Sequence, residues 1–419
     1  MSHALSILRT RPGFRRLWIA NLTSQLGDWV GWVAVSVYSI HEGDGLLPLA
    51  ALFAAHHLPI ALVSPWAGSF VDRHDRKRVL VVAALAMAAL TALMAVCMVL
   101  QFSAALPLVL ALRSGASAFF STAERAALPR LVERDELLVA GALESGTWSV
   151  VFCLGMALGG FLSALGTTLA LSLDALSFLL SASFLLRLPA IPPLPMANDS
   201  NDPKAARRAG IRAAWTHVRQ QPELLTATLA KTPHAIAGGA SWMALHGLVA
   251  LHFDGAAVAL TLGFAHTLRG LGTGLGPVSA VSLIRRGVHR RRVWVVFHGL
   301  ALAAMALFFL VPTGYALVVL SVLWGAGSGT NWLFSSEGMQ RLASDEFQGR
   351  VAALDGTFYI TAQALAVIAC AAVIDAGAPL SATLFFVTLG GVLSLVVFRQ
   401  RPAIDEPPTA ARELCAKFP

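Results

Sequence analysis

Residues Gly68 to Arg78 read Gly-Ser-Phe-Val-Asp-Arg-His-Asp-Arg-Lys-Arg, and this charged stretch separates two long apolar runs. It holds two acids and four permanent cations. A single charge at the centre of a bilayer costs about 2.5–3.5 kcal/mol or more. The stretch therefore predicts a water-exposed turn between two membrane helices, on the cytoplasmic side, where cations accumulate. We expect Asp72 to end the incoming helix and Gly68 to let two helices approach closely.

The composition is that of a protein that crosses a membrane several times. Of the 419 residues, 56% are hydrophobic and only 13% are charged, whereas soluble domains carry about 25% charged residues. The net charge of +8 does not indicate nucleic-acid binding, because the basic residues lie in turns that flank apolar runs. Arg9 and Arg11 lead directly into a full-length span, so no cleavable signal is expected. Cys97, Cys153 and Cys370 lie inside apolar runs and are expected to be core residues, so no metal or other cofactor is predicted.

Twelve apolar segments approach or exceed the roughly 20 residues that a membrane-spanning helix needs. The sequence therefore predicts an all-α integral membrane protein with twelve transmembrane helices. The predicted spans are Phe14–Ile40, Leu46–Val71, Val79–Leu100, Leu106–Leu128, Leu138–Leu165, Thr168–Leu188, Leu224–Leu251, Ala256–Ile284, Val293–Val311, Tyr315–Arg341, Val351–Ile374 and Leu380–Phe398.

The distribution of cations predicts the orientation. With the N-terminus placed inside, every lysine and arginine falls in a cytoplasmic segment or at the cytoplasmic end of a span, except Arg113, Lys231 and Arg269, which lie further inside spans. The turns at residues 41–45 and 252–255 carry acids and no lysine or arginine, as outside turns do. Both termini are therefore expected in the cytoplasm.

The middle of the chain divides the spans into two sets of six. It begins with four prolines and continues, from Lys204, as an amphipathic helix whose basic face is expected to lie toward anionic lipid. We predict a first six-helix bundle at residues 1–188, a linker at 189–222, a second six-helix bundle at 223–400 and a cytoplasmic tail at 401–419.

The two sets of spans are related in sequence. Arg130-Leu131 followed by Ala142-Leu143-Glu144 recurs, about 210 residues later, as Arg341-Leu342 followed by Ala353-Leu354-Asp355. A recurring pattern at this spacing predicts two parallel repeats of six helices, in a 6+6 pseudo-symmetric arrangement.

Several stretches resemble one transporter family. The pattern G-x-x-x-D-R-x-x-R-K-R at residues 68–78 resembles the loop between the second and third helices of the major facilitator superfamily. Residues 14–18, 24–29, 123–132, 174–178 and 349–351 resemble its drug:proton antiporter branch, which includes macrolide-efflux proteins and the enterobactin exporter. Residues 155–160 are similar to the fifth-helix motif of antiporters, although Met156 stands where that motif usually has proline.

The resemblance implies that helices 1, 4, 7 and 10 line a central cavity, around which the two halves rock. Charged residues inside spans are then candidates for function. Asp28 lies 11 residues past Leu17, about 16 Å into a core of about 30 Å, and Arg113 lies about 10 Å from the opposite face. We expect these two side chains to pair or to share a water network and to couple transport to protons. The alternative is an ion pair that is only structural.

The resemblance also implies a cytoplasmic gate. Asp72 would face the start of helix 11, and Arg73 or Arg76 would meet Glu124 at the end of helix 4. The alternative is that this charged loop, with Gly68 at its start, only sets topology.

Other charged residues lie near the cytoplasmic ends of spans or inside them. Lys231 and Glu337 are candidates for an ion pair at the inner mouth, and side chains that reach water separately are the alternative. Asp174 is expected to help the first bundle to pack, and Glu144 and Asp355 are expected to favour the positive ends of their helices.

The substrate site is predicted from polar and aromatic residues deep in the spans. Deep aromatic side chains with few charges suit a bulky, partly apolar organic molecule, although tryptophan also serves in helix packing. The candidates are Asn21, Gln25, Trp29, Trp148, Trp242, Asn331 and Trp332.

We interpret the chain as a monomeric secondary transporter of the plasma or inner membrane that exports an amphipathic small molecule in exchange for protons. No ATP site is visible in the sequence, so an ion gradient is the expected energy source. The rival interpretations are a siderophore or lipid exporter, a uniporter, or an uptake symporter. A non-transporting membrane sensor or scaffold is less favoured, and an enzyme least, because no catalytic constellation is found.

Overall fold

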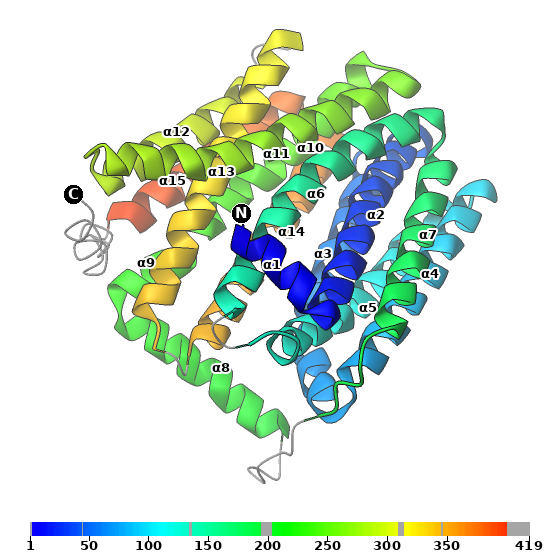
Figure 1. The fold of residues 1–419 in the computed structure, drawn as a ribbon. Coiled ribbons are helices and arrows are strands. Elements are labelled where there is room, and N and C mark those ends of the chain that lie inside the picture. Colours follow the sequence, from blue (N-terminus) through cyan, green and yellow to red (C-terminus); the bar gives the residue numbers. More distant parts are fainter. Residues whose placement is uncertain are drawn as a thin grey trace. The chain divides into compact units, whose positions relative to one another are not determined.

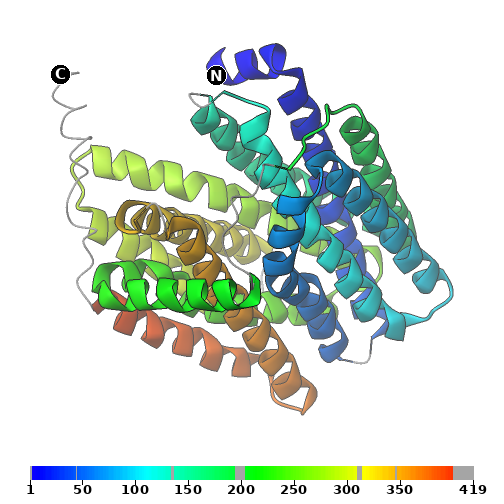
Figure 2. The ribbon, with the colours of Figure 1, turned by 90° about the horizontal axis from the view of Figure 1, so that it is seen from below.

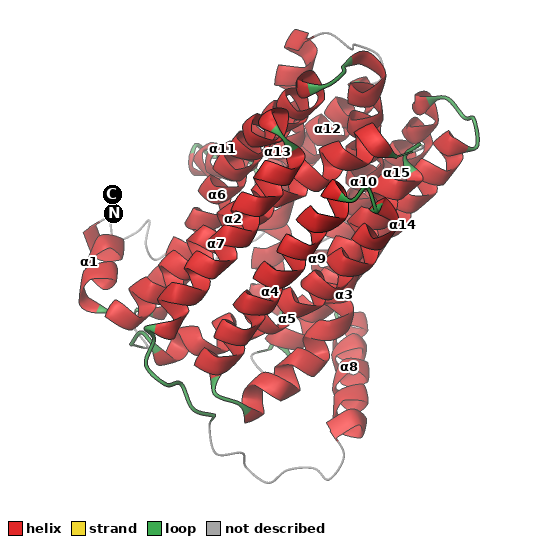
Figure 3. Cartoon of the chain, turned by 90° about the vertical axis from the view of Figure 1, so that its right-hand side faces the viewer, coloured by secondary structure: helices red, strands yellow, loops and turns green. Residues whose placement is uncertain are grey.

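The computed structural model describes residues 2–43, 45–133, 136–193, 203–308, 314–344 and 347–399. Within these ranges the chain is helical and contains no strand (Figures 1 and 3). The predicted cytoplasmic tail at 401–419 lies outside the described residues, as do the side chains of Lys204 and Arg208 on the predicted basic face of the linker helix.

The helices of the first half follow one another with short connections. They are α1 (Ser2–Thr10), α2 (Pro12–Glu42), α3 (Leu47–Arg73), α4 (Arg76–Val99), α5 (Leu106–Ala127), α6 (Leu137–Leu165) and α7 (Thr167–Leu186). Figure 2 shows this part of the chain in blue to green, with neighbouring helices packed along one another.

The second half begins with the helix predicted in the linker. Its elements are α8 (Pro203–Gln220), α9 (Pro222–Leu229), α10 (Lys231–His252), α11 (Ala256–Arg285), α12 (Arg290–Leu307), α13 (Gly314–Leu342), α14 (Gln348–Asp375) and α15 (Thr383–Arg399). Single turns of 3-10 helix lie at Ser103–Ala105, Leu128–Arg130 and Leu380–Ala382.

Each predicted span coincides with one helix, or with two consecutive helices, to within a few residues, except that the predicted end of the ninth span at Val311 lies outside the described residues. Among the described residues, nine segments are both long enough and apolar enough to cross a membrane. Helices α2, α11 and α12 are not among these segments, so the count of twelve crossings stays a prediction. The apolar segments are Leu47–Ser64, Arg76–Val99, Ser103–Arg130, Val139–Leu165, Thr167–Leu186, Pro222–His252, Ala316–Leu342, Gln348–Asp375 and Leu380–Val397.

The predicted seventh span is interrupted at Ala230, where α9 ends and α10 begins. Pro233 has no N–H to donate to the carbonyl of Leu229, so the regular bonding of one continuous helix fails at this point. Helix α13 supports the break, because Asn331 Nδ2 donates to the Ala230 carbonyl at 3.4 Å and Ser335 Oγ donates to the carbonyl of the preceding turn at 2.8 Å.

The chain forms two compact units. The first joins Met1–Asp199 with Trp242–Gly270 and Val367–Ala382, and the second holds the remainder. These units do not follow the chain halves, because the C-terminal parts of α10 and α14 and the N-terminal half of α11 belong with the N-terminal helices. The division into bundles at 1–188 and 223–400 stays a prediction.

The first unit has an apolar core between α2, α4, α5 and α7. Leu17, Leu80, Met87, Phe120 and Phe178 are buried in one cluster there. Fully burying side chains of this size stabilises a soluble domain by about 1.5–3 kcal/mol each. In a membrane that gain is replaced largely by close packing, which small residues permit.

Glycines mark the closest approaches between helices. A Cβ atom at Gly160 on α6 would lie 2.8 Å from Gly263 Cα and 2.8 Å from the carbonyl oxygen of Ala259, both on α11. A Cβ atom at Gly68, in contrast, would meet nothing within 4 Å. Within the described residues of the first unit, no helix approaches Gly68 closely, and an approach by a helix of the second unit stays a prediction.

Two aspartates tie distant parts of the first unit together through backbone amides. Asp75 accepts from the amide of Arg78, which caps α4, and from the amide of Ile191 at 3.1 Å, beyond α7. Asp375, at the end of α14, accepts from the amides of Leu46 and Leu47 at 2.8–3.0 Å. A carboxylate near the start of a helix is also stabilised by the positive end of the helix dipole.

We expect Gly160→Ala to destabilise the protein by about 1–3 kcal/mol, because the new methyl group would press on the backbone of α11. The measurement is the thermal unfolding midpoint in detergent. Gly274→Ala, on α11, is the matched control: its Cβ atom would meet nothing within 4 Å, so an unchanged or raised midpoint is expected. Equal midpoints for the two variants would contradict the close packing of α6 on α11.

Candidate functional site

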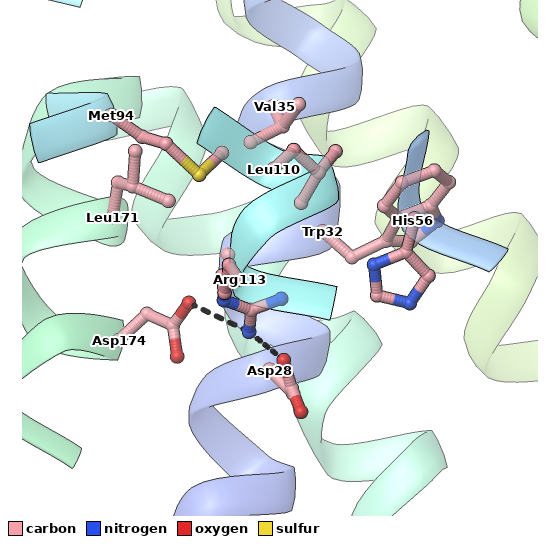
Figure 4. Close-up of a pocket in the computed structure, with 10 residues that line it drawn as sticks. Asp28, Trp32, Val35, His56, Met94, Leu110, Arg113, Leu171 and Asp174 are labelled. Carbon is pink, nitrogen blue, oxygen red and sulfur yellow. Dashed lines mark hydrogen bonds and ion pairs between the residues drawn. The ribbon is translucent and has the colours of Figure 1, made fainter. Parts of the chain in front are cut away.

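Three charged side chains meet inside the first unit: Arg113 on α5, Asp28 on α2 and Asp174 on α7 (Figure 4). Nη2 of Arg113 forms an ion pair with Asp28 Oδ1 and lies 3.7 Å from Asp174 Oδ2. Nε of Arg113 donates to Thr91 Oγ1 on α4 at 3.0 Å. The exposed fraction of the side chain is 5% for Arg113, 1% for Asp174 and 29% for Asp28. We call these three residues the charged triad.

Two glycines of α2 make room for the acid of α7. A Cβ atom at Gly27 would lie 2.7 Å from Asp174 Oδ1, and one at Gly31 would lie 2.9 Å from Asp174 Cγ. The glycines are four residues apart, so they share one face of α2. A longer side chain at either position would push Asp174 away from Arg113.

The charged triad carries two carboxylates and one guanidinium. With all three groups ionised its charge is −1, and a buried charge is costly unless it is compensated. Among the described residues, Asp174 Oδ1 has no hydrogen-bond partner. The site can therefore take one proton or one further cation without exceeding neutrality.

A small cavity of about 10 Å³ adjoins the charged triad. Trp32, His56 and Met94 line it together with the three charged residues. His56 Nδ1 is buried and has no hydrogen-bond partner in the described part of the chain. A cavity of this size has room for about one water molecule next to the carboxylates.

The predicted contact between Asp28 and Arg113 is confirmed, whereas the part played by Asp174 was missed. The interpretation from sequence gave Asp174 only a packing role. A usable signal was present: Asp174 lies seven residues past Thr167 and Arg113 seven residues past Leu106. Both are about 10 Å along their helices from the same side.

The polar and aromatic candidates of the first half lie on α2 and α6. Gln25 Nε2 donates to Asn21 Oδ1 at 2.9 Å, one turn away on the same helix. Trp29 packs edge-on against Trp148, with ring centres 6.1 Å apart, and against Phe152 at 4.7 Å. Trp148 is 42% exposed, so this cluster has an accessible aromatic side.

Trp242 is buried in a second aromatic cluster of the first unit. Its ring centre lies 5.7 Å from that of Trp32, 4.9 Å from that of Phe53 and 3.9 Å from that of His246. This packing occupies the indole, and its binding role stays a prediction.

Asn331 and Trp332 are adjacent in sequence but differ in environment. Asn331 is buried, accepts from Trp294 Nε1 at 2.9 Å and donates to Ala230, so both ends of its amide are used. Trp332 is 52% exposed. Asn331 thus supports the break in the seventh span, and a direct contact with substrate stays a prediction.

The ion pair considered between Lys231 and Glu337 is wrong, because each has another partner. Nζ of Lys231 donates to Asp355 Oδ2 at 2.6 Å, and Glu337 pairs with Arg290. Asp355 lies seven residues inside α14 rather than in its first turn. Its role is that of a buried counter-ion, not the helix-end role that we expected.

The charged loop is attached to the segment that follows α7. Arg76 is buried, and its Nη1 donates to the Pro192 carbonyl at 2.8 Å. In the described part of the chain no ion pair joins Arg73 or Arg76 to Glu124, and Glu124 Oε1 is buried without a hydrogen-bond partner. The predicted contact with Glu124 is therefore not formed. The contact of Asp72 with helix 11 would join the two units and stays a prediction.

No group of three or more histidine, cysteine, aspartate or glutamate side chains in the described ranges could hold a metal ion.

Long apolar helices with charged residues buried between them define a multi-pass membrane protein, and comparison with known proteins gives its class. The family model of the Major Facilitator Superfamily matches residues 17–367. The chain belongs to this superfamily of transporters.

Its relatives include two exporters. Macrolide efflux protein A of Streptococcus pyogenes is 24% identical over 382 residues, which cover 86% of this chain and 89% of that protein. The enterobactin exporter EntS of Shigella boydii is 27% identical over 426 residues, covering 95% of this chain and 96% of that protein. The crystal structure of the nucleoside transporter NupG superposes with a TM-score of 0.69 at 16% identity, over 92% of this chain and 98% of that chain, so it shares the fold.

We expect Arg113→Leu to lower stability by about 3–5 kcal/mol, because it leaves the buried carboxylate of Asp174 and the half-buried carboxylate of Asp28 without their cation. Thermal unfolding in detergent measures the effect, with Arg130→Leu as the exposed control. Adding Asp28→Asn and Asp174→Asn to Arg113→Leu should restore most of the loss. If Arg113→Leu and Arg130→Leu unfolded at the same temperature, the charged triad would not be a stabilising element.

Proposed function

We propose that this transporter exports a bulky amphipathic small molecule in exchange for protons, by alternating access. The observation that carries the proposal is the charged triad, with an excess of one negative charge beside a cavity. Proton binding would neutralise that excess, and proton release would restore it. Such a site gives a proton a stable position inside the membrane, as coupling requires.

Arg113 is placed to exchange partners between the two acids. Its Nη2 contacts Asp28 and lies 3.7 Å from Asp174. When one carboxylate holds the proton, the guanidinium pairs with the other. In one arrangement the cation is paired with α2, and in the other it is paired with α7. Proton binding can therefore bias a conformational equilibrium. One proton moving through about 100 mV releases about 2.3 kcal/mol, enough for a substrate gradient of roughly fifty-fold.

Aromatic side chains support an amphipathic substrate. Trp29, Trp148 and Phe152 form one cluster on α2 and α6, with Trp148 partly exposed. Aromatic walls with few charges favour organic molecules that are partly apolar. The similarity to macrolide efflux protein A is consistent with such a substrate.

Siderophore export is the second candidate function. The similarity to the enterobactin exporter EntS extends over 95% of this chain, and it favours this alternative. We also propose that the transporter acts as a monomer in the plasma membrane, with both termini in the cytoplasm, since its relatives are bacterial and its cations lie in the predicted inner turns.

Residues of the charged loop are proposed to act in the cytoplasmic gate. Asp72 and Arg73 are exposed, whereas Asp75 and Arg76 fix the loop to the segment after α7. The loop is therefore fixed through Asp75 and Arg76, while the exposed side chains of Asp72 and Arg73 can make further contacts. A two-state carrier needs contacts of this kind, made in one state and broken in the other.

We expect Asp28→Asn and Asp174→Asn each to abolish proton exchange, because each leaves the triad neutral without a proton. In everted vesicles, substrate added to the wild type should alkalinise the lumen, and the two variants should give no response. Glu133→Gln, a change in an exposed carboxylate outside the spans, is the control and should respond like the wild type.

A lumen response that persists in both aspartate variants would rule out proton coupling through the charged triad. A susceptibility panel of macrolides, other drugs and siderophores in an efflux-deficient strain separates the two candidate substrates. Protection against drugs alone supports drug export, and secretion of siderophore alone supports the second candidate.

A further inference from the structure

We propose that Lys231, Asp355 and Trp332 form a second binding site, which takes the ammonium group of an organic cation, and that Lys231 occupies it as a tethered stand-in when no substrate is bound. The proposal rests on the proposed export function, because it names the substrate class. It concerns the second unit only, and none of its residues belongs to the charged triad.

Lys231 is held as a bound alkylammonium ion would be. Its Nζ lies 2.6 Å from Asp355 Oδ2, 3.3 Å from Ser336 Oγ and 4.0 Å from the centre of the Trp332 ring. The exposed fraction is 3% for the Lys231 side chain and 7% for that of Asp355. A carboxylate, a hydroxyl oxygen and an aromatic face are the partners that an ammonium group prefers.

The unmet hydrogen-bonding capacity of this site belongs to the acid. An ammonium group has three N–H donors, and Lys231 has three partners for them. Asp355 Oδ1, in contrast, is buried and has no hydrogen-bond partner in the described part of the chain. A buried acceptor without a partner costs about 1–3 kcal/mol. The site therefore lacks a donor. A cationic ligand supplies a donor together with a positive charge, whereas an anionic ligand would place a second negative charge beside Asp355.

Trp332 gives the site an accessible side. Its indole is 52% exposed, whereas Lys231 and Asp355 are buried. Tyr359 packs edge-on against it, with ring centres 5.6 Å apart. The apolar body of a ligand can rest on this aromatic pair while its ammonium group reaches the carboxylate.

Lys231 lies at the start of a helix. Lys231 is the first residue of α10, directly after the break at Ala230, so its side chain leaves from a helix end rather than from the middle of a turn. A buried ion pair contributes little net stability when both partners are desolvated. Replacing one ammonium group by another keeps the charge of the site at zero, provided that Lys231 withdraws as the ligand enters.

A pair of dyes with the same ring system and opposite charge tests the site. Rhodamine 6G is an organic cation whose two ethylamino groups share the positive charge and carry N–H donors, as the ammonium group of Lys231 does. Fluorescein is an organic anion with the same xanthene body. Binding to purified protein in nanodiscs is measured by fluorescence anisotropy, with empty nanodiscs as the blank. The variants are Lys231→Met, Asp355→Asn and Trp332→Leu, with Asp254→Asn as an exposed control.

We expect the lysine and aspartate variants to change rhodamine 6G affinity in opposite directions. Lys231→Met should tighten binding, by about tenfold if the lysine fills the site nine-tenths of the time, because it removes the internal competitor. Asp355→Asn should weaken binding by tenfold or more, and Trp332→Leu by about two- to thirtyfold. Asp254→Asn should bind like the wild type, and fluorescein affinity should not follow these changes.

The proposal is overturned if Lys231→Met weakens binding of fluorescein while Asp355→Asn strengthens it, because the site would then take anions. It is also overturned if rhodamine 6G affinity is the same in all variants. Should Lys231→Met fail to fold, Trp332→Leu decides, because an exposed indole can be removed without leaving a buried charge. Dye binding needs no proton gradient, so a wild-type protein that binds rhodamine 6G but exchanges no protons would refute the coupling proposal and leave this site standing.

Discussion

The first unit depends on one requirement: a guanidinium buried to 95% must be compensated within hydrogen-bonding reach. Arg113 meets it with Asp28 and Asp174, and with a hydroxyl group from α4. Four helices are thereby fixed around one side chain. The glycines of α2 follow from the same requirement, because the carboxylate of Asp174 needs the space that their missing side chains leave.

The two buried charge sites differ in their balance. The charged triad sums to −1, whereas the pair of Lys231 and Asp355 sums to zero. A site with an excess charge gains by taking up an ion, and a neutral site gains only by exchanging one ion for another. On the functions proposed above, this difference suits the first site to a proton and the second to the charged group of a substrate.

The sequence predicts position along a helix well and orientation about the helix axis poorly. Helix ends follow from apolar runs and charges, and the contact between Asp28 and Arg113 follows from counting residues along two spans. From the sequence, Lys231 was paired with Glu337, which lies at a similar distance along its helix. In the structure the side chain of Lys231 faces Asp355 instead. The direction in which a helix face points depends on packing against several neighbouring helices. Residue spacing along the chain carries no information about that packing.

Several acids of this protein differ in the kind of donor that satisfies them. Asp75 and Asp375 accept from backbone amides, and a backbone amide of its own turn holds the pKa of Glu136 below its usual range. Backbone donors keep their positions as long as the local fold is intact. These acids therefore hold neighbouring elements together. Asp174 and Asp355 instead face cationic side chains, and each keeps one oxygen without a hydrogen-bond partner among the described residues. A side-chain cation can rotate away, so only acids of the second kind can exchange their partner for a proton or a ligand without unfolding a helix.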